Sequence, residues 1–185
     1  MTSRDDIVTA ALRHLNVHPT ASTAEIAAAA GISRATLHRH FASRDDLLRE
    51  IGLRSLEHWT GVQESTGMVA ATSSRDAARL RACAEEMLRQ LVVSADDFAF
   101  ALVDEYLYAL PEINARTEEL FELEVAFWAA ALDAGVLRPG LTPRWVAHAS
   151  YGVLVACREA LRHGDVARRD VPDLVLSTFL HGVSA

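Results

Sequence analysis

Basic and hydroxyl side chains gather in one short stretch of the chain, and no acidic residue lies between positions 26 and 44. An arginine can donate two hydrogen bonds to the edge of a guanine, and a threonine can contact a thymine methyl group. This composition predicts contacts with double-stranded DNA. The residues expected to make them are Ser22, Thr23, Ser33, Arg34, Ala35, Thr36, His38, Arg39, His40 and Arg44.

Two of these arginines have different expected tasks. Arg39 falls within a predicted helix and is expected to reach base edges. Arg44 falls at the start of the next helix, where backbone N–H groups and a cation can together hold a phosphate.

Two predicted helices within residues 22–41 hold these side chains. Ser22 and Glu25 have the spacing of a capping box, Gly31 suits a left-handed helix end, and Ser33 suits the start of the second helix. The pattern predicts a helix-turn-helix. A solvated basic helix is the alternative, and the glycine turn, the two caps and the lack of acids count against it.

The stretch IAAAAGISRATLHRHFASRDDLLREI, within residues 7–52, resembles the DNA-binding head of TetR-family regulators. The resemblance implies a homodimer that binds a palindromic operator, usually as a repressor released by a small molecule. Three features depart from the family pattern. His38 replaces the usual tyrosine, Arg44 replaces the usual lysine, and the link NVHPTAS is shorter than usual and lacks a Gly-aromatic step.

The whole chain is expected to be all-α, with a three-helix head at 1–50 and a helical effector-binding and dimerisation body at 51–185. Residues that favour helices dominate, and the alternation of apolar and polar residues that is typical of strands is absent. The first helix is expected at about 5–15 and the fourth from 43 to about 61, followed by a loop or frayed helix end at 64–74. Body helices are expected at 75–93, from Ser94 to before Pro111, and at 113–134, 142–164 and 170–185.

Several polar residues interrupt apolar faces of the body helices, and a buried charge is costly unless it is paired. Such positions can line a ligand pocket, although an exposed edge or an internal ion pair explains them equally well. The candidates are Tyr106, Glu124, Trp128, Tyr151 and Arg158.

The last two predicted helices carry more apolar surface than one chain can cover, which predicts a homodimer. The expected interface residues are Ala149, Gly152, Ala156, Val175 and Phe179.

Charge and composition exclude other classes. The first 58 residues hold equal numbers of arginines and acids, so the net charge of −7 lies in the remainder and argues against non-specific adhesion to nucleic acid. Neither the His38–His40 pair nor the His14–His18 pair is expected to bind a metal, and no cofactor is expected. Cys83 and Cys157 are expected to be reduced core residues.

No signal peptide, membrane-spanning run or catalytic motif stands out, so we expect a soluble, cytoplasmic protein that is not an enzyme. Two rival functions stay open. One is a helical small-molecule carrier or enzyme with a vestigial head, and the other is a helix-turn-helix protein of another type, such as a sigma-like factor.

Overall fold

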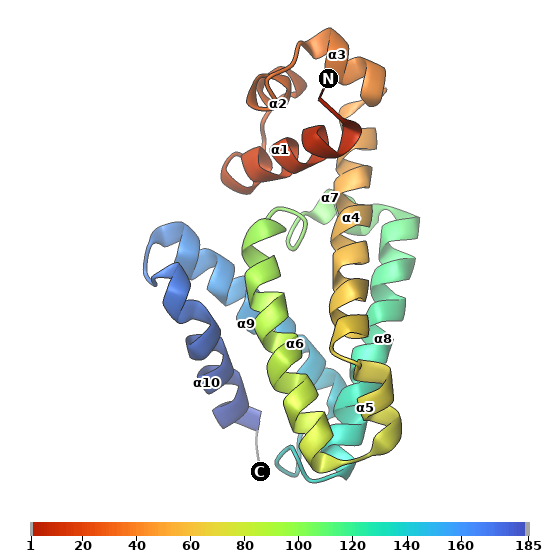
Figure 1. Cartoon of the computed structure of the whole chain (residues 1–185), viewed down its shortest axis with the longest axis vertical. Helices are drawn as coiled ribbons and strands as arrows, with labels where there is room; N and C mark the ends of the chain where they lie inside the picture. Colours follow the sequence, from red (N-terminus) through yellow and green to blue (C-terminus); the bar gives the residue numbers. More distant parts are fainter. Residues whose placement is uncertain (1, 184–185) are drawn as a thin grey trace. The chain divides into compact units, whose positions relative to one another are not determined.

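The computed structural model describes residues 2–183, and these residues form helices without a β-strand. The expected all-α fold is confirmed. None of the described helices is both long and apolar enough to cross a membrane. In chain order (Figure 1) the helices are α1 (Arg4–Val17), α2 (Thr23–Ala29), α3 (Arg34–His40), α4 (Arg44–Ser65), α5 (Met68–Ser74), α6 (Ala77–Asp97), α7 (Glu105–Ala109), α8 (Pro111–Asp133), α9 (Pro143–His163), the 3-10 helix η1 (Arg168–Asp170) and α10 (Val171–Val183).

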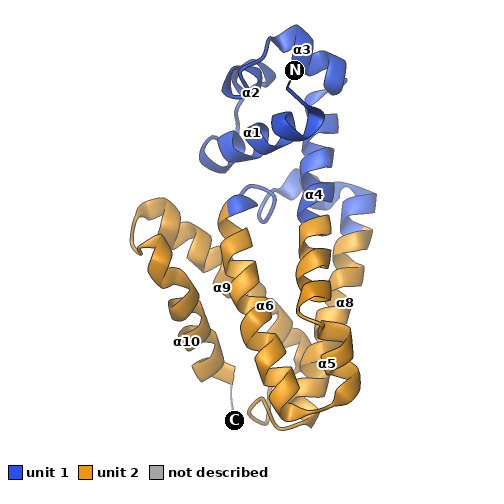
Figure 2. Cartoon of the chain, viewed as in Figure 1, with its two compact units in different colours: residues 1–56, 97–114 blue, residues 57–96, 115–185 orange. Residues whose placement is uncertain are grey.

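The chain divides into two compact units, which Figure 2 shows in different colours. Unit 1 comprises residues 1–56 and 97–114, and unit 2 comprises residues 57–96 and 115–185. The first half of α4 therefore belongs to unit 1 and the second half to unit 2. Unit 1 thus contains a segment that comes much later in the chain than its three N-terminal helices.

Unit 1 is built on one buried face of α1. Ser3 caps this helix, because its hydroxyl accepts from the Asp6 N–H while the Asp6 carboxylate accepts from the Ser3 N–H. The backbone N–H and then the hydroxyl of Ser3 hold the pKa of Asp6 below its usual value. The buried side chains of the N-terminal part of unit 1 include Ile7, Val8, Ala11, Leu12, Leu15, Ile26, Leu37, Phe41, Leu47, Leu48 and Ile51.

The segment 97–114 differs from its prediction. The expected helix start at Ser94 is wrong, because Ser94 lies inside α6 and its hydroxyl donates to the Gln90 carbonyl at 2.7 Å. The helix of this segment is the short α7, whose cap is Asp104. The segment lies close to α4 at Gly52, where an added Cβ would stand 3.0 Å from a methyl carbon of Ile113. Glycine at this position therefore permits the close approach.

The loop or frayed helix end expected at 64–74 is also wrong for most of its length. Helix α4 continues to Ser65, and α5 follows after Gly67, whose φ of 65° ends the first helix. The hydroxyls of α5 find acceptors within the helix itself, as the Thr72 hydroxyl donates to the Met68 carbonyl at 2.8 Å, so the helix leaves them satisfied. The side chain of Met68 is buried, which anchors the helix.

Unit 2 has an aromatic core. Phe127 and Trp128 of α8 are fully buried, and the Trp128 ring lies 5.6 Å from the ring of Phe179 on α10. Helix α9 begins and ends as predicted, with Thr142 as its cap and Gly164 at φ 74° after its last turn. Helix α10 packs against α9, so the last two helices form a pair.

Candidate functional site

The turn between α2 and α3 has the predicted geometry. Ser22 and Glu25 form the capping box that starts α2, and the hydroxyl and then the backbone N–H of Ser22 lower the pKa of Glu25. Gly31 adopts φ 68°, and the N–H of Ile32 donates to the Ala27 carbonyl at 3.0 Å. Because a positive φ is costly for residues other than glycine, Gly31 is what allows α3 to begin so soon after α2.

Helix α3 has one buried face and one open face. Leu37 is buried, as is Phe41 directly after the helix. Of the predicted DNA contacts, Ser22, Ser33, Arg34, Ala35, His38 and Arg39 are exposed, and Thr23, Thr36, His40 and Arg44 are half-buried. Arginine and histidine side chains therefore line an accessible helix surface.

A short hydrogen-bond chain orders the open face of α3. The Ser33 hydroxyl accepts from the Thr36 N–H at 3.1 Å and shares a hydrogen bond with the Thr36 hydroxyl at 3.0 Å. Arg39 donates from Nη2 to the same Thr36 oxygen at 3.3 Å. This contact orients the guanidinium of Arg39 along the helix surface.

Arg4 holds the other end of α3, and the sequence pattern did not predict this role. Its guanidinium donates to the carbonyl of His40 at 2.6 Å and to the carboxylate of Glu50 at 2.8 Å, and it lies 4.3 Å from the centre of the Phe41 ring. One side chain at the start of α1 thus joins the end of α3 to α4. No sequence motif marks this role, because the three partners are distant from Arg4 in the chain.

Arg44 lies close to a different part of unit 1. Its Nε donates to the Ala21 carbonyl at 3.3 Å and its Nη2 donates to the Pro19 carbonyl at 3.2 Å. Both acceptors belong to the link between α1 and α2. The phosphate contact expected for Arg44 stays a prediction, and these two bonds use the Nε–H and one Nη2–H of its guanidinium.

Glu124 is the most distinctive polar residue of unit 2. Its carboxylate is buried and accepts from the Trp59 indole N–H at 2.7 Å and from the side chain of Gln63. Burial raises the pKa of Glu124 to about 7, against the lowering effect of these two hydrogen bonds. The indole N–H of Trp128, one turn further along α8, is buried and has no hydrogen-bond partner among the described residues.

The other pocket candidates lie in different surroundings. Tyr106 belongs to α7 in unit 1, and burial followed by the neighbouring Asp45 raises its pKa. Tyr151 is 38% exposed on α9. The Arg158 side chain is mostly buried and pairs with Glu159, while its Nε has no partner among the described residues. Tyr106 and Glu124 therefore belong to different units.

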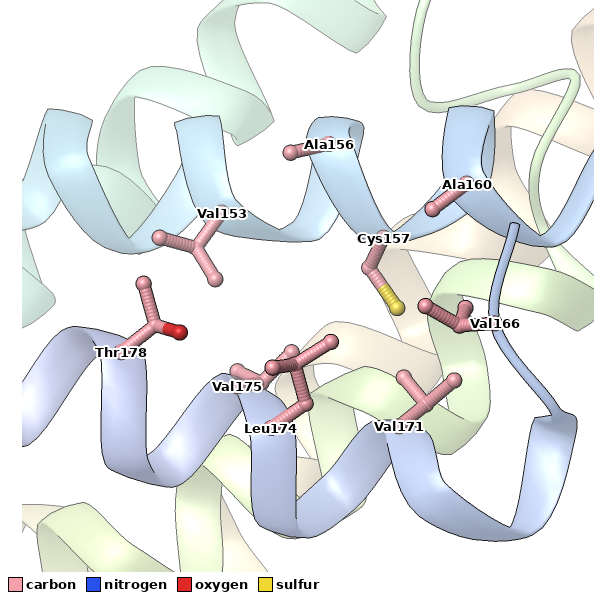
Figure 3. Close-up of a pocket in the computed structure, with 9 residues that line it drawn as sticks. All are labelled: Val153, Ala156, Cys157, Ala160, Val166, Val171, Leu174, Val175 and Thr178. Atoms are coloured by element: carbon pink, nitrogen blue, oxygen red, sulfur yellow. The ribbon is translucent and has the colours of Figure 1, made fainter.

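A small apolar groove of about 180 Å³ lies between α9 and α10 (Figure 3). Val153 and Cys157 point into it from α9, and Val171 and Val175 point into it from α10. Of the predicted interface residues, Gly152 and Ala156 are exposed and Ala149 is half-buried, whereas Val175 and Phe179 are buried within the chain. None of the five pocket candidates lines this groove.

The cysteines of the described residues are separate from one another and from any cluster of metal-ligating side chains. Cys83 and Cys157 are free and buried, and burial raises the pKa of both thiols. Among residues 2–183, no three His, Cys, Asp or Glu side chains lie close enough together to hold a metal ion.

Three comparisons place this architecture among known proteins. Residues 7–51 match the sequence model of bacterial regulatory proteins of the tetR family. The HTH-type transcriptional repressor LfrR of Mycolicibacterium smegmatis is 28% identical over 184 residues, which are 98% of this chain and 90% of LfrR.

Solved structures give the same result. The crystal structure of LfrR from Mycobacterium smegmatis in complex with proflavine has a TM-score of 0.74 and 25% identity, and it covers 98% of this chain and 96% of LfrR. The TetR-family regulator PfmR of Thermus thermophilus has a TM-score of 0.70 at 22% identity, with 97% of this chain and 94% of PfmR covered. PfmR supports the fold alone, and LfrR is described as a transcriptional repressor.

Proposed function

Because this chain belongs to the TetR family of bacterial regulatory proteins, we propose that it is a repressor that leaves a palindromic operator when a small-molecule effector binds. The observation that carries the proposal is the open face of α3. Arg34, His38 and Arg39 are exposed there, while Leu37 anchors the opposite face. A helix whose apolar side packs against the protein and whose cationic side is exposed is suited to entering a major groove.

The contacts divide by position. Arg34, Thr36 and Arg39 are assigned to base edges, because arginine and threonine read guanine and thymine there. Helix starts suit contacts with phosphate, because their first N–H groups point outward. The residues assigned to supporting contacts with the backbone or neighbouring bases are Ser22, Thr23, Ser33, Ala35, His38 and His40.

A palindromic operator requires a symmetric dimer that presents two α3 helices about 34 Å apart. We place its interface on one face of α9, where Gly152 and Ala156 are exposed and Ala149 is half-buried. Leu174 of α10 is 47% exposed and extends this apolar face. Val175 and Phe179 support the interface from inside the protomer.

The effector is proposed to be a flat aromatic cation. Glu124 offers a buried carboxylate, Trp128 is fully buried one turn further along α8, and the half-buried Trp59 donates its indole N–H to that carboxylate. Cations bind well to aromatic faces and to desolvated carboxylates. Proflavine, the molecule bound by the relative LfrR, has this chemistry. The unpartnered Trp128 N–H is a donor that a bound molecule can satisfy.

Selection of bound duplexes from a random DNA library tests the central proposal. We expect one palindromic consensus, and we expect proflavine to release it. A carrier or enzyme with a vestigial head would instead bind all sequences alike or not at all, and that result would contradict the proposal. Because the protein is proposed to act on an operator, we also propose that it is cytoplasmic.

A further inference from the structure

Arg44 contacts the backbone of a specific link, residues 18–22, which joins α1 to α2. Its Nε reaches Ala21 and its Nη2 reaches Pro19, at 3.3 and 3.2 Å. The guanidinium is planar, so its two donors have a fixed spacing that matches two separate carbonyls. Within the link, the Ala21 N–H also donates to the His18 carbonyl at 3.0 Å.

The start of α4 is poorly suited to a phosphate. The Ser43 hydroxyl accepts from the Asp46 N–H at 3.0 Å, and the Asp46 carboxylate accepts from the Ser43 N–H at 3.2 Å. The protein thus satisfies these two donors itself, as the capping box of Ser22 and Glu25 does at the start of α2, and the difference at α4 is the charge of its first turn. Asp45 and Asp46 also place two negative charges in the first turn, where they would repel a phosphate.

We propose that Arg44 is a positioning residue, which fixes the α1–α2 link and through it the helix-turn-helix, and that it does not act as a phosphate contact. The link ends at Ser22, the cap of α2, and α2 supports α3 through the Gly31 turn. An arginine suits this task because the link is short and presents free carbonyls. The proposal rests on the proposed function for its effect on DNA, but the clamp itself exists without DNA.

The first experiment uses the whole protein without DNA. Hydrogen exchange is measured for wild type, Arg44→Ala, Arg44→Lys and the control Arg13→Ala, which removes an exposed arginine of α1. Loss of the clamp is expected to speed exchange at the Ala21 amide about tenfold, a typical effect of losing charged hydrogen bonds. Arg44→Lys is expected to fall between alanine and wild type, because one ammonium does not reproduce the planar fork. Arg13→Ala is expected to match wild type.

A general loss of stability would speed exchange in the cores of α1 and α4 as well as in the link. We expect the change to be confined to residues 18–25. Unchanged exchange in Arg44→Ala, or equally faster exchange throughout unit 1, would overturn the proposal. If the alanine variant does not fold, the same comparison between wild type and Arg44→Lys decides.

The second experiment measures affinity for the selected operator at several salt concentrations. We expect Arg44→Ala to weaken binding about tenfold at every salt concentration with an unchanged slope. A lost phosphate contact would instead lower the log–log slope by about 0.9 per subunit. That lower slope, together with full affinity in Arg44→Lys, would overturn the proposal. If wild type binds no operator, the proposed function fails, while the exchange experiment still tests the clamp.

Discussion

The side-chain oxygen of Asn16, in the last turn of α1, accepts a hydrogen bond from the backbone N–H of Phe100 at 2.8 Å. The same amide donates from Nδ2 to the carbonyl of Asp97, also at 2.8 Å. One side chain therefore joins the last turn of α1 to the last residue of α6 and to Phe100 just after it. Both partners belong to unit 1, so this bridge helps to hold residues 97–114 there.

Asn16→Ala removes both bonds and is expected to lower the free energy of unfolding by about 1–3 kcal/mol. Asn16→Asp keeps the acceptor for Phe100 but puts a negatively charged oxygen against the Asp97 carbonyl, so its loss is not expected to be smaller than that of Asn16→Ala. Urea unfolding measures both values, and hydrogen exchange at the Phe100 amide locates the effect. Val17→Ala, at the neighbouring exposed position, is the control. An alanine variant with wild-type exchange at Phe100 would show that the bridge carries no stability.

Arg39→Ala is expected to reduce affinity for the best operator by about 1–3 kcal/mol and to relax preference at one base pair in each half-site. The reason is that Arg39 lies on the open face of α3, where Thr36 orients it. Titration of duplexes that carry the consensus or single substitutions measures both effects. Equal losses of affinity on every duplex would mean that Arg39 contacts only phosphate. Recognition of the bases would then depend on Arg34, Thr36 and His38.

The helix-turn-helix was predictable because its signals are local. Ser22 with Glu25, Gly31 and Ser33 each act on backbone groups within a few residues, and the structure confirms all of them. The same holds for Thr142 and Gly164 at the two ends of α9. Local capping therefore located these helix ends to within one or two residues.

Signals that depend on tertiary contacts were missed or misread. Ser94 has the spacing of a cap, but the buried apolar face of α6 continues through it, and its hydroxyl bonds within the helix instead. Arg4 acts on three groups that are distant in sequence, so no spacing reveals it. Glu124 was recognisable as a polar residue on an apolar face, but its partners Trp59 and Gln63 come from α4 and are evident only from the fold.

Gly152→Arg is expected to shift the protein from dimer toward monomer at micromolar concentration. A Cβ at Gly152 meets no atom within 4 Å in the protomer, so the substitution should disturb assembly and spare the fold. Gly61→Arg is the matched control, because Gly61 is also exposed, lies in a helix and has open space around it, but is distant in sequence from α9 and α10. Sedimentation measures the mass of each variant. A wild type that sediments as a monomer, or equal sedimentation masses for Gly152→Arg and Gly61→Arg, would contradict the interface.

The buried carboxyl of Glu124 predicts a pH dependence of stability with a definite sign. Its pKa is about 7 in the folded protein and is expected to be near 4.5 in the unfolded chain. Between these values the unfolded chain loses its proton while the folded protein retains it, so stability is greatest below about pH 4.5 and falls as the pH rises toward 7.

Glu124→Gln keeps the shape of the side chain and an acceptor for Trp59, but it cannot ionise. We therefore expect the stability of the variant relative to wild type to rise by about 3 kcal/mol between pH 4 and pH 8, since each pKa unit corresponds to 1.36 kcal/mol. Urea unfolding of both proteins across this range measures the difference, in which other titrating groups cancel. The same variant is expected to bind proflavine more weakly above pH 7, where the wild-type carboxylate is ionised and attracts a cation. Parallel stability profiles for the two proteins would mean that Glu124 titrates normally, and the buried acid would then lose its role in the proposed effector site.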